Sequence, residues 1–97
     1  MRRAARKDRN HSEIVEALRK AGCRVQSLAA VGGGVPDLLV MCRRNLYLFE
    51  VKDGAKRPSG RKLTDDQVKW HSEWAGAPVV VVKSVDDALR EIGAAHV

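Results

Sequence analysis

Residues 36–52 read PDLLVMCRRNLYLFEVK, and this stretch decides the fold we expect. It contains two apolar runs, residues 37–42 and 46–52, whose composition is typical of β-strands. Only three polar residues, 43–45, separate the two runs. Because a connection this short joins antiparallel neighbours, the stretch predicts a β-hairpin.

The length of the hairpin turn sets which side chains face each other. A turn made of Arg43 and Arg44 alone would place Asp37 directly opposite Glu50. If Asn45 were a third turn residue, the register would move by one residue, and Asp37 would then point to the other side of the sheet. The sequence leaves both registers open.

Further elements on either side extend the hairpin into a larger sheet. Helical spacing, capping residues and β-branched runs indicate where they lie. In chain order they are a helix from residue 10 to 21, a weak strand over 24–28, a helix over 65–75 capped by Thr64 and Gln67, a strand over 79–82, and a short helix that Ser84 caps and that ends at 92. Four valines form the strand 79–82, so we expect it to be buried on both faces. The order α-β-β-β-α-β-α predicts an α/β fold with a mixed central β-sheet flanked by helices.

Positive charge is concentrated in two segments of the 97-residue chain. Residues 1–9 hold five cations against one acid, and residues 52–62 do the same, so each segment carries +4 within a total of +6. We expect residues 1–9 to be a basic tail and residues 10–97 to form one domain. Such clustering is typical of proteins that bind a polyanion, although a solvated tail and loop would give the same pattern.

Composition excludes several other classes of protein. The longest apolar stretches, residues 38–42 and 78–82, are far shorter than the ~20 residues that a membrane-spanning helix needs. The basic start of the chain is not followed by the apolar segment of a secretory signal. Cys23 and Cys42 lack metal-ligand spacing, so we expect reduced thiols and a cytoplasmic protein of a bacterial or phage-infected cell.

The hairpin strands carry charged side chains at positions where a charge without a partner would be unfavourable in the core of a sheet. Glu50 and Lys52 are two residues apart on one strand, so both lie on the same face of the sheet. If Asp37 faces Glu50, two carboxylates come close enough to repel unless a cation lies between them. Mg²⁺ prefers such hard oxygen ligands. An exposed edge hairpin with ordinary polar positions is the alternative interpretation.

At these residues the chain resembles the PD-(D/E)xK nuclease superfamily. Pro36-Asp37 followed by Glu50-Val51-Lys52 matches its signature. The flanking residues 34–40 and 63–67 are similar to the virus-type replication-repair nuclease (VRR-NUC) branch, which often occurs in phages or mobile elements. The resemblance covers about residues 10–90. It implies a restriction-endonuclease-like fold and a metal-dependent DNA endonuclease that uses Mg²⁺ or Mn²⁺.

The resemblance also implies roles for individual residues. Asp37 and Glu50, together with Val51, would hold the metal ion. Lys52 would be the catalytic lysine, stabilising charge on the phosphate or helping to deprotonate the attacking water. Gln67 matches a glutamine that lies near the site in the family, and it could also simply close a helix capping box.

An acidic residue on the first helix usually completes the site in this family. Glu13 lies at the border of the apolar arc of that helix and Glu16 on its far side, so we assign the catalytic role to Glu13. Some relatives carry the acid two residues earlier, where this chain has His11. Glu13 could instead interact with the helix dipole or form a capping box with Asn10.

Two sets of residues are candidates for contact with nucleic acid. The expected backbone-binding cations are Lys56, Arg57, Arg61, Lys62, Arg3 and Arg6. Trp70 and Trp74 lie one helical turn apart and could stack on splayed bases. We favour half-buried core aromatics that cover the sheet, because the chain has only four aromatic residues.

The sequence predicts only the general class of the substrate. Phosphate contacts position a nucleic acid and do not read its sequence, so we expect selectivity for structure, as for branched DNA or a Holliday junction. Small nucleases of this superfamily that cut branched DNA commonly pair as homodimers, and we expect the same here. The alternatives are a nicking or flap nuclease of the same fold, or a non-catalytic DNA-binding module.

Overall fold

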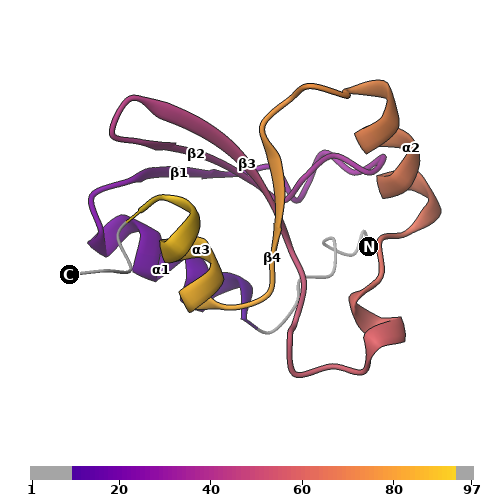
Figure 1. The fold of residues 1–97 in the computed structure, drawn as a ribbon, viewed down its shortest axis with the longest axis horizontal. Coiled ribbons are helices and arrows are strands. Elements are labelled where there is room, and N and C mark those ends of the chain that lie inside the picture. Colours follow the sequence, from indigo (N-terminus) through magenta and orange to yellow (C-terminus); the bar gives the residue numbers. More distant parts are fainter. Residues whose placement is uncertain (1–9, 94–97) are drawn as a thin grey trace, which may run out of the picture.

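The order of elements agrees with the order expected from the sequence. A computed structural model describes residues 10–93 of the chain. The elements are α1 (His11–Lys20), β1 (Arg24–Ser27), β2 (Leu38–Cys42), β3 (Asn45–Val51), a 3₁₀ turn η1 (Pro58–Arg61), α2 (Asp65–Glu73), β4 (Val79–Val82) and α3 (Val85–Glu91) (Figure 1). No helix in this described part is long and apolar enough to cross a membrane.

The four strands form one mixed sheet in the order β1-β2-β3-β4. β1, β2 and β3 are antiparallel neighbours, whereas β4 runs parallel to β3. Arg43 and Arg44 have φ values of 51° and 71°, which are the left-handed values that a two-residue hairpin turn requires. This turn pairs Leu38 with Phe49, so Asp37, one residue earlier, falls opposite Glu50. The two-residue register is therefore confirmed.

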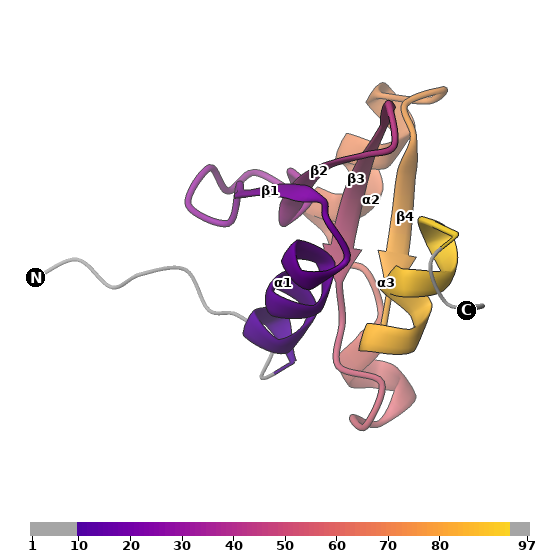
Figure 2. The ribbon, with the colours of Figure 1, turned by 90° about the vertical axis from the view of Figure 1, so that its left-hand side faces the viewer.

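Helices α1 and α3 cover one face of the sheet (Figure 2). Apolar residues of α1 recur at helical spacing, so the helix has one apolar side, and this side is buried. The core that results is formed by Ile14, Leu18, Cys23, Leu38, Val40, Cys42, Phe49, Val51, Val82, Ala88 and Ile92. Its strand residues alternate along β2 and β3, which leaves the intervening side chains on the opposite face.

That opposite face is apolar and partly exposed. The register places Leu39 beside Leu48 and Met41 beside Leu46, and we call these four residues the open sheet face. Met41 is 41% exposed and Leu46 47% exposed. The valines of β4 share this partial exposure, and only Val82 is buried. The expectation that β4 is buried on both faces is wrong, because β4 is an edge strand with helices packed on one side only.

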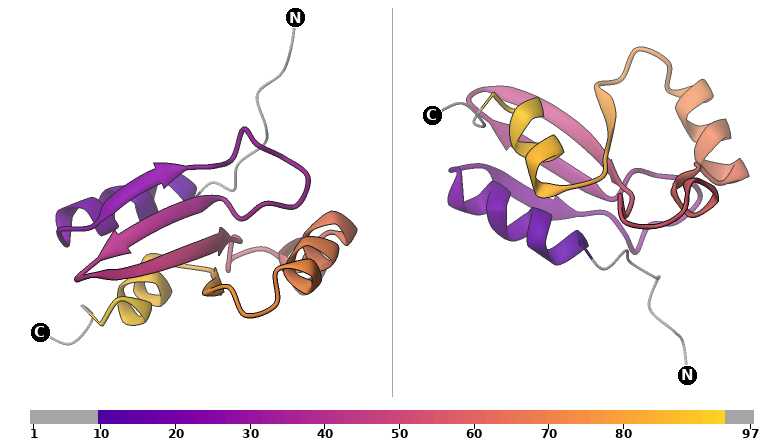
Figure 3. Two further views of the ribbon diagram at one scale, coloured as in Figure 1. Left: turned by 90° about the horizontal axis from the view of Figure 1, so that it is seen from above. Right: turned by 60° about the horizontal axis from the view of Figure 1, so that its bottom comes forward.

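Helix α2 lies apart from the other helices, at the opposite end of the sheet from α1 and α3 (Figure 3). None of its residues is buried. Trp70 and Trp74 stack on each other, with ring centroids 5.0 Å apart and planes 9° apart, and Trp74 is 56% exposed. The preferred interpretation of these rings as core aromatics is therefore wrong for Trp74, because α2 stands beside the sheet and does not cover it.

Candidate active site

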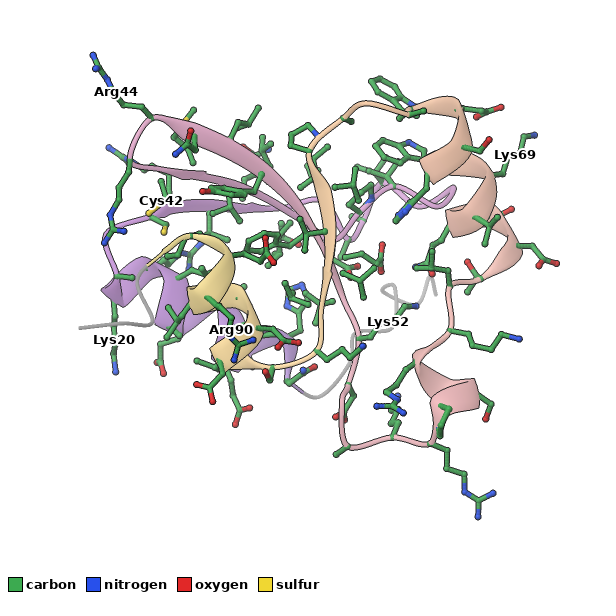
Figure 4. All side chains as sticks on the ribbon, viewed as in Figure 1. Lys20, Cys42, Arg44, Lys52, Lys69 and Arg90 are labelled. Carbon is green, nitrogen blue, oxygen red and sulfur yellow. The ribbon has the colours of Figure 1, made fainter. Side chains whose placement is uncertain are left out.

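The site is built around the carboxyl end of β3. Glu50 and Lys52 project from the same face of this strand, as alternation requires. Both side chains are buried: Glu50 is 1% exposed and Lys52 is 8% exposed. Figure 4 shows Lys52 on the side of β3 that faces α2. Charged side chains are seldom buried so deeply unless other polar groups bind them. The polar groups around Glu50 and Lys52 therefore determine which chemical role these two side chains can take.

Asp37 enters the site from the neighbouring strand. Its Oδ2 accepts a hydrogen bond from the backbone N–H of Val51 at 2.8 Å, and its own carbonyl accepts one from Leu28 at 2.7 Å. The aspartate is therefore fixed between β1 and β3 at the point where β2 begins. This placement brings its carboxylate beside the strand segment that carries Glu50 and Lys52.

Gln67 connects the two buried charges. Its Nε2 donates to Glu50 Oε2 at 2.9 Å, and its Oε1 accepts from Lys52 Nζ at 2.9 Å. The same Oε1 accepts the backbone N–H of Thr64 at 2.9 Å, and Thr64 Oγ1 accepts the backbone N–H of Gln67 at 3.2 Å. Gln67 thus closes the capping box of α2 and contacts the site at once. The two roles considered for it from the sequence are both present.

Gly34 allows the loop that precedes Asp37 to pack closely against helix α2. It has a φ of +86°, and a Cβ at this position would overlap the backbone carbonyl of Asp66 in the first turn of α2. Only glycine permits this contact without strain. Gly34 is the last of three consecutive glycines, 32–34, and nothing in the sequence indicates that one of them packs against the helix that carries Gln67.

The donor set suits a hard divalent cation. In a strand the N–H and C=O of one residue point to the same side, so the Val51 carbonyl faces the side from which its N–H binds Asp37. Asp37, Glu50 and this carbonyl are all oxygen donors, and Mg²⁺ is commonly held by one or two carboxylates while it keeps several waters. Among residues 10–93, no group of three or more His, Cys, Asp or Glu side chains is arranged to hold a metal ion. Asp37, Glu50 and the Val51 carbonyl would leave the remaining positions around such an ion to water and phosphate oxygens.

Comparison with known proteins places the chain in a family. The sequence matches the family described as archaeal Holliday junction resolvase (Hjc) over residues 2–94. The chain belongs to this family. It is also similar to a solved structure titled "VRR_NUC domain", with 31% identity, a TM-score of 0.63, and coverage of 86% of this chain and 91% of that one. No curated protein matches the sequence.

Family membership confirms the main predictions from the sequence. The chain is a PD-(D/E)xK nuclease with a restriction-endonuclease-like α/β fold, as its motifs suggested. Its mixed four-stranded sheet agrees with that fold. The nuclease signature also falls on the side chains that the structure brings together, since Asp37, Glu50 and Lys52 all lie where β2 begins and β3 ends.

Within residues 10–93, no hydrogen bond joins Glu13 to this cluster. Its side chain is exposed, and it lines a cavity of about 380 Å³ together with Asn10, Asp53 and Lys83, among others. His11, two residues earlier, is buried on the inner side of α1. Asn10 does not cap α1 through its side chain, so the capping-box alternative for Glu13 is not formed. The catalytic role of Glu13 remains a prediction.

The basic segment after β3 leads directly away from the site. Lys56, Arg57 and Lys62 are exposed, and Arg61 is half-buried at the end of η1. Figure 4 shows this segment below α2, on the same side of β4 as Lys52. These cations thus lie on the side of the sheet from which a phosphate backbone would reach the carboxylates. Arg3 and Arg6 lie outside the described residues.

Proposed function

We propose that this nuclease is a Mg²⁺- or Mn²⁺-dependent endonuclease that hydrolyses phosphodiester bonds in branched DNA, such as a Holliday junction. The observation that carries the proposal is the convergence of Asp37, Glu50, Lys52 and Gln67 at one end of the sheet. A protein that only bound DNA would gain nothing from burying carboxylates beside its basic segment, since carboxylates repel phosphate.

Each residue of the cluster has a chemical task in this proposal. Asp37, Glu50 and the Val51 carbonyl would hold the metal ion, which when bound activates water and neutralises charge on the phosphate. Lys52 supplies a positive charge beside the scissile phosphate and stabilises the charge that builds up there. Gln67 holds the Lys52 ammonium group at 2.9 Å from its Oε1, so the amine does not have to be ordered during the reaction.

The basic surfaces would hold the DNA while these groups act. Lys56, Arg57, Arg61 and Lys62 contact phosphates in this proposal, together with Arg3 and Arg6 of the basic tail. Such contacts do not read bases, which favours selection by DNA shape. A branched substrate is supported by the name of the matching family. The nuclease would act in the cytoplasm of a bacterial or phage-infected cell.

We further propose that the nuclease is a homodimer, so that two sites can cut two strands. The open sheet face supports this, because it presents apolar side chains over two adjacent strands and includes a groove of about 120 Å³ lined in part by Leu39, Met41 and Leu46. Exposed contiguous apolar patches of this kind mark interaction sites. A second copy would bury them with the same face, as a two-fold interface requires.

The proposed function is tested by cleavage of a labelled panel of DNA substrates. The panel contains linear duplex, flap, nicked duplex, four-way junction and single strand, each with Mg²⁺, Mn²⁺ or EDTA. We expect metal-dependent cleavage that is fastest on the four-way junction. Lys52→Ala should abolish it, whereas Lys20→Ala, which removes a lysine from the far end of α1, should cleave normally.

Other outcomes would identify the alternatives. Cleavage that is fastest on the flap would favour a flap nuclease, and single cuts in duplex DNA would favour a nicking enzyme. Binding without cleavage by both the wild type and Lys52→Ala would overturn the enzymatic proposal in favour of a DNA-binding module.

A further inference from the structure

Asn10 connects three elements at the base of the active site. Its Nδ2 donates to the carbonyl of Lys52 at 3.0 Å and to the carbonyl of Lys83 at 2.9 Å. The first follows β3, the second follows β4, and Asn10 itself directly precedes α1. The residue is only 9% exposed, so water competes little for these bonds.

The two carbonyls lie where the pairing of β3 with β4 ends. Lys52 N–H donates to the Val82 carbonyl at 3.0 Å, and beyond it Gly54 N–H donates to the Lys83 carbonyl at 3.1 Å. After Lys52 the chain enters the basic segment and no longer has a regular strand partner. Asn10 therefore binds the main chain where the hydrogen bonds between β3 and β4 end, at Lys52, whose side chain carries the proposed catalytic amine.

The side chain of Asn10 binds these two carbonyls and does not cap helix α1. An asparagine before a helix ordinarily accepts a hydrogen bond from the first turn, but Asn10 makes no side-chain cap. Both N–H groups of its amide point at the two carbonyls, which fixes the orientation of the amide because an oxygen in that place would be repelled. Its Oδ1 is buried and has no hydrogen-bond partner within residues 10–93.

We propose that Asn10 is a positioning residue for catalysis. By fixing the main chain at Lys52 it would keep the amine of that side chain within reach of Gln67 and of the scissile phosphate. A displacement of about 1 Å in a catalytic group can cost ~100-fold in rate, so a residue that holds the backbone can control the reaction without touching the substrate. The inference rests on the proposed nuclease function, and it adds a determinant outside the family signature.

The test compares Asn10→Asp with the wild type in steady-state cleavage of the preferred DNA. This near-isosteric change replaces two donors by a carboxylate that faces two carbonyls. We expect kcat to fall by about 10-fold to 100-fold while KM for DNA stays within about twofold. Asn10→Ala removes the donors without adding charge. It should also lower kcat while KM stays nearly unchanged, and the loss of kcat should be smaller than in Asn10→Asp.

Two controls separate positioning from general destabilisation. Ile92→Val trims a buried side chain at the end of α3, beside the hairpin turn, where the Ile92 carbonyl accepts from Arg43, and so lowers stability at the opposite end of β3 from the site. Its kcat should be unchanged at a temperature where all variants are folded. Asn45→Asp makes the same chemical change at an exposed position next to the hairpin turn and should be neutral.

Hydrogen exchange gives a readout that does not depend on activity. In Asn10→Ala, the amides of Lys52 and Gly54 should exchange faster, while the amide of Leu48 at the other end of β3, which donates to Pro78, should not change.

The proposal is overturned if kcat of both Asn10 variants equals that of Ile92→Val, or if only KM rises. Loss of folded structure in both Asn10 variants would also overturn it, since Asn10 would then be required for the fold. Cleavage by the wild type in the same assay keeps these outcomes distinct from failure of the nuclease function itself.

Discussion

The side-chain amide of Gln67 donates a hydrogen bond to the carboxylate of Glu50 across 2.9 Å. This bond joins α2 to β3, although α2 has no buried residue that could dock it by apolar packing. The helix is instead held at its first turn, where Gln67 also closes the capping box. Formation of the proposed active site and attachment of the helix therefore depend on the same side chain.

Replacement of Gln67 should weaken both functions. In Gln67→Ala, Glu50 and Lys52 lose a shared partner and Thr64 loses a capping acceptor. We expect stability to fall by about 1 kcal/mol, the usual value of a helix cap. We expect kcat to fall by roughly 100-fold, comparable to removal of one stabilising group from a preorganised site. Thermal unfolding and cleavage kinetics measure the two effects, with Gln26→Ala on exposed β1 as the matched control.

Asp37→Asn should separate metal binding from folding. The amide oxygen can still accept the bond from Val51 N–H, so the fold should persist, but one negative charge is lost from the donor set. Because a ligand that binds only the folded state raises its stability, Mg²⁺ should raise the melting temperature of the wild type and not that of Asp37→Asn. Cleavage in Mg²⁺ should be abolished.

Glu16→Gln is the control for this change, since Glu16 is exposed on α1. It should retain both the Mg²⁺-dependent rise in melting temperature and cleavage. Glu13→Gln in the same experiment decides the first-helix prediction: loss of cleavage would support a catalytic role for Glu13, and normal cleavage would remove it from the site. An equal Mg²⁺ response in Asp37→Asn and the wild type would contradict the assigned metal ligands.

The parts of the structure that could be predicted from the sequence are those fixed by local rules. The short polar connection at residues 43–45 predicted the hairpin, although not which of two registers it takes, and Thr64 with Gln67 marked the start of α2. These signals lie within a few residues of each other. The role of Asn10 depends on carbonyls 42 and 73 residues away, which no local pattern encodes.

Burial was harder to predict because it depends on which faces the helices cover. The four valines of β4 have the composition of a central strand, yet the strand lies at the edge of the sheet. Trp74 has the bulk of a core residue, yet α2 stands beside the sheet. In both places the apolar side chains exceed what one chain buries, which is consistent with the proposed homodimer.

A charge on the open sheet face should disrupt that dimer. Leu46→Lys would place an ammonium group in the apolar contact, and burial of an unpaired charge is costly. Sedimentation or light scattering over a range of concentrations should show a dimer for the wild type and a monomer for this variant. Val31→Lys, at a more exposed apolar position in the loop before β2, is the control and should remain dimeric. A monomeric wild type would contradict the proposal, and dissociation by Trp74→Lys alone would move the interface to α2.

Removal of a cation from the basic segment should change the salt dependence of DNA binding. Each phosphate contact contributes about 0.9 to the slope of log affinity against log salt concentration for duplex DNA. Arg57→Ala should therefore lower the magnitude of this slope by about 0.9 and weaken binding similarly for all sequences. Titrations by fluorescence anisotropy at several salt concentrations measure it. Lys20→Ala should leave the slope unchanged, and an unchanged slope for Arg57→Ala would exclude that side chain from the contact.

The buried thiol of Cys23 should make the fold sensitive to alkaline pH. Burial and then a hydrogen bond with Cys42 raise the pKa of Cys23 from 9.0 to about 12. Between these values the unfolded chain releases a proton that the folded chain retains, so stability is fully present below pH 9 and is lost as the pH rises toward 12. One such group contributes a slope of about −1.4 kcal/mol per pH unit in this window.

Cys23→Ala isolates this contribution, because all other titrating groups are shared with the wild type. The variant should be less stable at pH 7, where it has lost a buried side chain, and the difference should shrink as the pH rises from 9 to 10.5. Denaturant unfolding at a series of pH values measures both proteins under reducing conditions. Parallel stability curves across that range would show that the thiol ionises equally easily in the folded and unfolded chains, contrary to its burial against Cys42.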